Sequence, residues 1–191
     1  MNAFSPSGGV VGKRPRTKLG PDMLPMERLH HMLGVNEGFR SELEILMPHL
    51  RKITANWADG IPRSILADAA HQDVITIRDL NAITEYVAAY LEALYAGQFG
   101  DKFEAPLDGI ALILKKHGVN PGWATIAFSN AFEGAQQRLF FETRKINSRV
   151  FPAALRCLMK IMVLTIHLLN RRDHELNDVT PQQGVKQVPT Q

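Results

Sequence analysis

Seven histidines are the residues in this 191-residue chain whose side chains bind metals most readily. The histidines are His30, His31, His49, His71, His117, His167 and His174. None of them belongs to a His-Glu-x-x-His pair of zinc ligands, and the adjacent His30 and His31 point to different faces of any helix that contains them. The single cysteine, Cys157, can form neither an internal disulfide nor a cysteine metal cluster. The sequence therefore predicts no zinc site of a familiar pattern.

The histidine in the most distinctive setting is His117, which lies in the stretch LKKHGVNPGW, residues 114–123. This stretch ends one helical pattern at Gly118 and begins another at Asn120-Pro121, where a proline needs no partner for an N–H. A neutral imidazole here could hold a metal or a cofactor. A histidine at a helix end can also complement the helix dipole and bond the last carbonyl groups. Both interpretations of His117 stay open at this point.

The sequence contains no set of residues typical of catalysis. The stretch SGGVVGKR superficially resembles a phosphate-binding loop, but no Ser or Thr follows its lysine and no strand precedes it. No serine or cysteine lies in a nucleophile-elbow sequence. We therefore expect a protein that is not an enzyme.

The basic charge of the chain is concentrated at its N-terminus. The formal net charge is +3, and residues 1–20 carry four Lys or Arg and no acid, so the remainder carries 3 − 4 = −1. Residues 1–22 are rich in Ser, Gly and Pro, which predicts a disordered basic tail. We expect one folded domain at residues 23–176, a flexible polar tail at 177–191, and no specific binding of nucleic acid.

The expected location is the cytoplasm. The longest apolar stretch, residues 157–169, is interrupted by Lys160 and His167, which argues against a membrane span. The N-terminus lacks the apolar block of a secretory signal. Cys157 lies inside the apolar stretch and is expected to act as small apolar filler in a reducing compartment.

Helical periodicity dominates the chain and predicts an all-α fold. The first helix is expected to end at Gly34, and the second to begin after a cap at Asn36 and to be either kinked or divided into two consecutive helices at Pro48. A third strong pattern ends at Gly97, and its apolar stripe consists of Leu80, Ile83, Val87, Leu91 and Leu94. A cap at Asp101 is expected to start the next helix, with one apolar face formed by Phe103, Leu107, Ile110 and Leu114.

The last two helices, expected at residues 121–145 and 150–172, indicate a dimer. The final helix is apolar on nearly all sides between Ala153 and Leu169, which is more surface than one core can bury. A helix pair from each of two subunits can bury that surface as a four-helix bundle. The residues expected at this dimer interface are Leu155, Leu158, Met159, Met162, Val163, Ile166 and Leu169.

The order and spacing of these elements resemble the sensor-globin family, the globin domains of globin-coupled sensors, with protoglobins as relatives. The resemblance covers roughly residues 25–175. The stretch HHMLGVNEGFRSELEILMPHLRKITANW looks like the family's opening, in which a helix ends in a Phe-Tyr pair. The stretch RDLNAITEYVAAYLEALYAGQFGDKFEAPLDGIALILKKHGVNPGW is similar to the family's middle, which ends in His-x-Arg-Ile-Gly-Leu-Pro-Pro-x-Trp. The resemblance implies a single globin-like domain whose last two helices form a dimeric bundle.

The chain departs from this family at both groups that haem oxygen chemistry needs. With Gly118 and Trp123 set on the family motif, the iron-binding histidine falls on Leu114, which has no lone pair for iron. The Phe-Tyr pair falls on Asn56-Trp57, so an indole replaces the tyrosine hydroxyl. His117 lies about 300° around the helix from Leu114 and ~4.5 Å along it, so it stays near the same face as a displaced ligand.

The resemblance implies a pocket lined by Trp57, Val87, Leu91, Phe103, Leu107, Ile110, Leu114, His117 and Trp123. The leading hypothesis is a non-enzymatic bacterial sensory or regulatory domain with altered or lost haem ligation. It would bind a hydrophobic ligand, such as a fatty acid or an uncoordinated tetrapyrrole, and signal through a homodimer to a separate protein partner. One alternative is a haem-binding oxygen or gas sensor with His117 as the proximal metal ligand. A second alternative is a helical interaction scaffold without a ligand.

Overall fold

The computed structural model describes residues 25–144 and 150–178, and all regular structure in these ranges is helical, which confirms the all-α prediction. The predicted tail at residues 1–22 lies outside the described ranges, as does the predicted tail at 177–191 except for its first two residues, which belong to the last helix. The helices are α1 (Met26–Leu33), α2 (Glu37–Ile53), α3 (Trp57–Ile65), α4 (Ala69–Gln72), α5 (Ile77–Tyr95), α6 (Asp101–Lys116), α7 (Gly122–Arg144) and α8 (Val150–Asp178).

Several helix ends lie where local sequence places them. Gly34 closes α1 with a φ of 63°, which a residue with a Cβ adopts only under strain. Asn36 caps α2, because its side chain accepts a hydrogen bond from the backbone N–H of Phe39 at 3.1 Å. The cap expected at Asp101 is wrong by one residue, since Gly100 precedes α6 and Asp101 is its first residue.

Of the two outcomes expected at Pro48, the division into two helices is also wrong. Helix α2 continues through Pro48 to Ile53, and the chain breaks instead between Thr54 and α3. The Thr54 hydroxyl donates to the carbonyl of Leu50 at 2.8 Å and lies 2.5 Å from the hydroxyl of Tyr95 on α5. A buried side chain that bonds both its own helix and a neighbouring one therefore fixes the position of this break.

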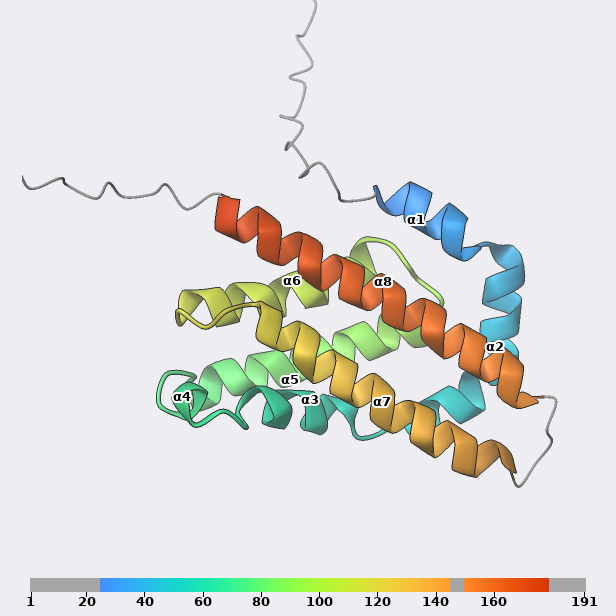
Figure 1. The fold of residues 1–191 in the computed structure, drawn as a ribbon, viewed down its shortest axis with the longest axis horizontal. Helices are drawn as coiled ribbons and strands as arrows, with labels where there is room; N and C mark the ends of the chain where they lie inside the picture. The colour runs from blue at the N-terminus through green and yellow to red at the C-terminus, as the bar shows by residue number, and fades with distance from the viewer. Residues whose placement is uncertain (1–24, 145–149, 179–191) are drawn as a thin grey trace, which may run out of the picture.

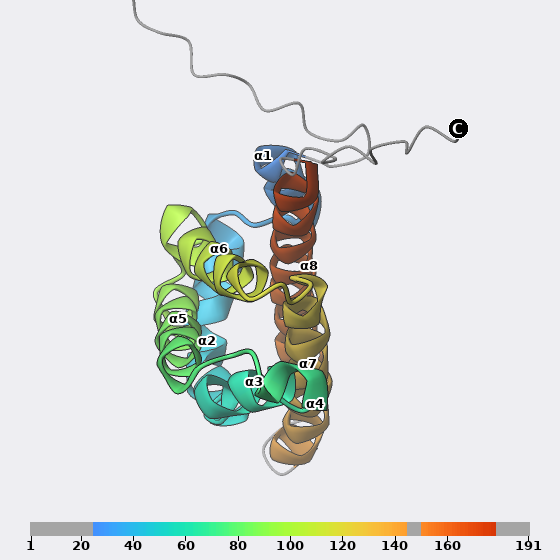
Figure 2. The ribbon, with the colours of Figure 1, turned by 90° about the vertical axis from the view of Figure 1, so that its left-hand side faces the viewer.

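The helices form two layers (Figures 1 and 2). The antiparallel hairpin of α7 and α8 makes one layer, and the antiparallel pair α5 and α6 lies in the other together with α2. Helix α3 contacts both α5 and α7 and so joins the layers at one edge. The core lies between the layers and contains apolar residues from every helix except the short α4.

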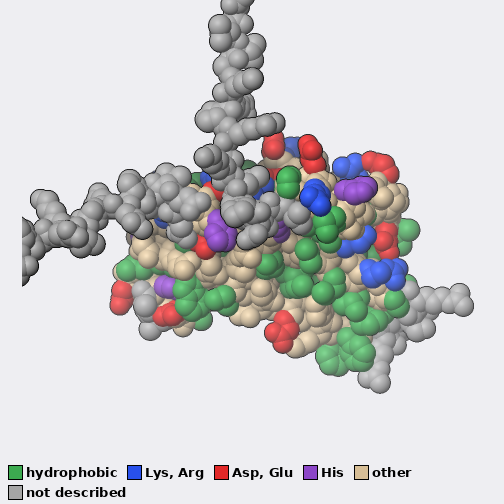
Figure 3. All heavy atoms as spheres, turned by 45° about the horizontal axis from the view of Figure 1, so that its top comes forward, with side chains coloured by type: hydrophobic (Ala, Val, Ile, Leu, Met, Phe, Trp, Pro, Cys, Tyr) green, Lys and Arg blue, Asp and Glu red, His purple; other side chains and the backbone are tan. Residues whose placement is uncertain are grey.

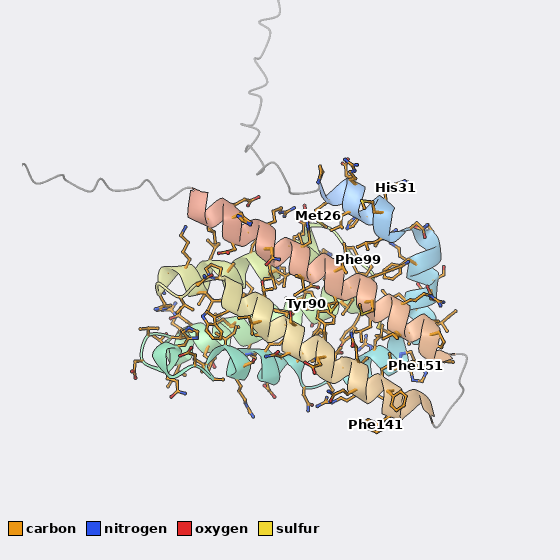
Figure 4. The ribbon with its side chains drawn as sticks, in the orientation of Figure 1. Met26, His31, Tyr90, Phe99, Phe141 and Phe151 are labelled. Atoms are coloured by element: carbon orange, nitrogen blue, oxygen red, sulfur yellow. The ribbon has the colours of Figure 1, made fainter. Side chains whose placement is uncertain are left out.

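The centre of the core is organised around Tyr90, which Figure 4 labels behind α7 and α8. Its ring lies 4.8 Å from that of Phe103 on α6 and 5.3 Å from that of Phe128 on α7, measured between centroids. Its hydroxyl lies 2.8 Å from the hydroxyl of Thr165 on α8, which donates to the carbonyl of Ile161. These buried hydroxyls are satisfied, so one side chain joins α5, α6, α7 and α8.

Among residues 25–144 and 150–178, one helix, spanning Val150–Leu176, is long and apolar enough to cross a membrane by length and composition. Of its most apolar window, 44% is buried inside the protein. Helix α8 also packs on α7, α6 and α2. The core helix of a water-soluble protein has these same properties, so the test gives only weak evidence for a span.

Candidate functional site

The structure gives His117 a protein partner. His117 is the residue that ends α6, and its Nε2 lies 2.9 Å from Oδ2 of Asp79 in the first turn of α5. Because α5 and α6 are antiparallel, the end of one helix meets the start of the other. The Nζ of Lys116 lies 3.2 Å from the second carboxylate oxygen of Asp79. The two ends are thus joined by one carboxylate with two basic partners.

Thr76 completes this cluster from the residue that precedes α5. Its hydroxyl donates to Oδ2 of Asp79 at 2.5 Å and accepts from the backbone N–H of Asp79 at 3.2 Å. The hydrogen bond from Thr76, followed by those from Lys116 and His117, lowers the pKa of Asp79 from 3.8 to about 2. A carboxylate at a helix N-terminus is also favoured by the helix dipole. Asp79 is therefore an anion at neutral pH.

This geometry favours the interpretation of His117 as a helix-end residue over that of an iron ligand. Its Nε2 is occupied by Asp79, a buried carboxylate in the first turn of α5. Within residues 25–144 and 150–178, no group of three or more His, Cys, Asp or Glu is arranged to hold a metal ion. The sequence carried part of this signal, since Thr76-x-x-Asp79 matches the capping box pattern.

The residues expected to line a ligand pocket form a packed core. The buried members of that set are Trp57, Val87, Leu91, Phe103, Leu107, Ile110 and Leu114. They belong to a single hydrophobic cluster, and Leu114 has no exposed surface. His117 and Trp123 lie at the periphery of the core. The Trp123 ring packs against the ring of His71, with 4.8 Å between the ring centroids. The structure thus brings most of the set together, with the central space filled by neighbouring side chains such as Tyr90 and Phe128.

An exposed apolar surface lies on the outer side of α7 and α8, and we call it the α7–α8 face. Its members include Ile126 (48% exposed) and Phe140 (46%) on α7, and Met159 and Val163 (both 38%) on α8. Three half-buried residues of the predicted interface lie along the same helix, and these are Leu155, Met162 and Ile166. Figure 3 shows hydrophobic side chains gathered on one side of the molecule, over these helices.

Two residues of the predicted interface lie elsewhere. Leu158 and Leu169 are only 1% and 2% exposed in the single chain, because they point from α8 into the core. They therefore contribute nothing to a surface that a second subunit could cover. The remaining five residues of that prediction are at least partly accessible.

The C-terminal half of α8 is fixed to α6 by charged side chains. Arg171 donates to Glu104 at 2.7 Å, and Arg172 lies 3.5 Å from Asp108 and 2.8 Å from Glu175. Burial raises the pKa of Asp108, and the two arginines oppose that shift. These pairs explain why α8 extends to Asp178, beyond the end expected at residue 172. Sequence analysis missed them because their partners lie more than sixty residues apart.

A hollow of about 250 Å³ lies between α3 and α7. Of the three hollows described, this one alone is lined by a residue of the predicted pocket, Trp57. Its floor is apolar, and its rim carries amide, hydroxyl and guanidinium groups. This combination of an apolar floor and a few polar groups is typical of small-molecule sites.

Comparisons with known proteins give no relative: no family model, no protein of curated function and no solved structure matches this chain.

Proposed function

We propose that this protein is a non-enzymatic regulatory module that forms a homodimer through the α7–α8 face and passes its signal to a separate protein partner. The observation that carries the proposal is that face, with Ile126, Phe140, Met159 and Val163 all more than a third exposed. Exposed apolar side chains gathered along one helix hairpin often mark a protein–protein contact.

The shape of the α7–α8 hairpin supports association with a second copy. Helices α7 and α8 contain 23 and 29 residues, so at a rise of about 1.5 Å per residue they are roughly 35 and 44 Å long. Two such hairpins can pack into a four-helix bundle, in which each subunit contributes the same surface. The seam between the helices is already closed within one chain, for example by the Thr125–Asn170 hydrogen bond at 3.1 Å.

The sensory part of the proposal rests on the resemblance of the sequence to sensor globins. That resemblance implies a globin-like arrangement of the helices, which is part of the proposal. The structure weakens the alternative of a haem gas sensor, because Leu114 is buried at the family's ligand position and His117 is engaged with Asp79. The packed core favours a module without haem. The ligand-free scaffold differs from the leading proposal only in having no small-molecule signal.

Light scattering on the full chain tests the dimer. We expect a dimer mass at micromolar concentration and a monomer mass for Val163→Glu, since a charge would be buried without a partner at the centre of the contact. Val163 is more than a third exposed, so the substitution leaves the subunit folded. Ile45→Glu is the matched control, because Ile45 is 76% exposed on α2, and this variant should stay dimeric. A monomeric wild-type protein would refute the proposal.

A further inference from the structure

Two glycines open the hollow between α3 and α7. Gly60 lies inside α3 and Gly134 inside α7, and both line the hollow. Neither has a positive φ, and a Cβ built on either would meet no atom within 4 Å. A glycine inside a helix loses stability relative to alanine. No turn and no close contact in the fold requires a glycine at either position. The effect of the two glycines is to leave the space between α3 and α7 open.

The same pattern surrounds both glycines. Asn56 and Ser64 lie four residues before and after Gly60, and Asn130 and Arg138 lie four residues before and after Gly134. Residues four apart share one face of a helix. Each helix therefore presents a gap with a polar side chain at either end. All six residues line the one hollow.

The orientation of the helices pairs these polar side chains across the hollow. Lys52, in the last turn of α2 and so near the start of α3, lies 3.9 Å from Glu142 near the end of α7. His71, after α3, contacts Trp123 at the start of α7. The helices are thus antiparallel, which brings Asn56 to the same end as Arg138 and Ser64 to the same end as Asn130.

The end with Arg138 is suited to a carboxylate. No acidic residue lines the hollow, and Glu142, one turn beyond Arg138, is engaged with Lys52. Asn56 precedes α3, yet its side chain makes no capping hydrogen bond to that helix. A guanidinium and a nearby amide can bind the two oxygens of one carboxylate.

The floor of the hollow is apolar and rigid. Trp57 is buried, and its ring packs edge-on against Phe132 with 4.7 Å between centroids. Ile61, Ala127 and Ala135 complete the floor and are buried as well. A volume of about 250 Å³ holds roughly eight water-sized groups at ~30 Å³ each. The site therefore fits a small planar or branched molecule.

We propose that this hollow binds a compact apolar monocarboxylate, such as a small aromatic acid, with the carboxylate at Arg138 and Asn56 and the apolar body over Trp57. This inference deepens the proposed regulatory function and rests on it, since it names the signal that the module would receive. Helix α7 carries the site on one side and Ile126 and Phe140 of the α7–α8 face on another. A ligand wedged between α3 and α7 can thus act on the dimer contact through one helix.

The test is a titration of the full chain with benzoate, phenylacetate or hexanoate, in which tryptophan fluorescence measures binding. The chain has two tryptophans, so a Trp123→Phe background leaves Trp57 as the reporter. We expect saturable binding of at least one acid below about 10 mM. We expect Arg138→Gln to weaken it at least tenfold through loss of a charge-assisted hydrogen bond. Arg63→Gln, which removes an exposed arginine of α3 that does not line the hollow, should change nothing.

Two further variants test the space itself. Gly134→Leu and Gly60→Leu each fill the hollow from one side, and each should abolish binding while circular dichroism reports an unchanged helix content. Absence of saturable binding by all three acids, or binding that survives both leucine variants, would overturn the inference. Light scattering on the same samples separates this inference from the proposed function. A dimer that binds no acid refutes the ligand alone, and a monomer that binds one refutes the dimeric module alone.

Discussion

The imidazole Nε2 of His117 lies 2.9 Å from the Oδ2 of Asp79, so that the residue capping the end of α6 pairs with the first turn of α5. This contact removes the reason to treat His117 as a free ligand. It also makes Asp79 the residue on which the α5–α6 junction depends, since Thr76 and Lys116 bond the same carboxylate.

The stability of the protein should therefore depend on the charge of Asp79. Its pKa is lowered from 3.8 to about 2, so its contribution to folding is fully present above about pH 4 and is lost as the pH falls toward 2. In urea unfolding, Asp79→Asn should be less stable than wild type at pH 7, and the difference should close between about pH 4 and 2. Asp59→Asn, an exposed acid in the first turn of α3, should show little difference at any pH. A gap for Asp79→Asn that persists unchanged at pH 2 would contradict this account.

Haem should not bind as a stoichiometric ligand. Leu114 occupies the position expected for an iron ligand and is buried in a packed core, and the Nε2 of His117 is bonded to Asp79. We expect no sharp Soret band when haem is titrated into the full chain. His117→Ala should lower thermal stability without altering the absorption spectrum. A strong band that disappears in His117→Ala would instead support the haem gas-sensor alternative.

Removing either partner of the Tyr90–Thr165 hydrogen bond should lower the free energy of unfolding by a different amount. Thr165→Val leaves the fully buried Tyr90 hydroxyl without its partner, which costs about 1–3 kcal/mol of unfolding free energy. Tyr90→Phe should cost less, about 1 kcal/mol, because the Thr165 hydroxyl keeps its bond to the carbonyl of Ile161. Denaturant unfolding of both variants and of the double variant measures this order. Additive effects in the double variant would show that the pair is not coupled.

Replacing the glycines of the α3–α7 hollow should stabilise the fold. Gly60→Ala and Gly134→Ala each add a methyl group into open space and remove a helix-interior glycine, for a gain of about 0.5–1 kcal/mol. Two other glycines serve as controls with the opposite sign. Gly118 has a φ of 71°, and a Cβ on Gly109 would lie 2.5 Å from the ring of Tyr86, so alanine at either should destabilise. Thermal unfolding of the four variants provides the comparison, and a loss at Gly134 would mean that the hollow is closed in solution.

The sequence alone determined the features that depend on neighbours along the chain. Local patterns predicted the all-α class, the end of α1 at Gly34, the cap at Asn36 and the inward face of Phe103, Leu107 and Leu114. Each depends on φ angles, capping groups or a 3.6-residue period, which act over a few residues. The failure at Pro48 shows the limit of that approach, because the helix tolerates the lost hydrogen bond there and breaks instead at Thr54.

Only the tertiary structure decided what the inward faces enclose and what the histidine does. Leu114 lies in a packed core because residues from other helices, among them Tyr90 and Phe128, join it in one buried cluster. The partner of His117 lies 38 residues away on α5, and the antiparallel packing of two helices brings it within hydrogen-bond distance. The apolar residues of α8 likewise divide into core and surface only once α7 and α6 cover one side of this helix. The period of the sequence defines the faces of a helix, and contacts with other helices determine which face is covered.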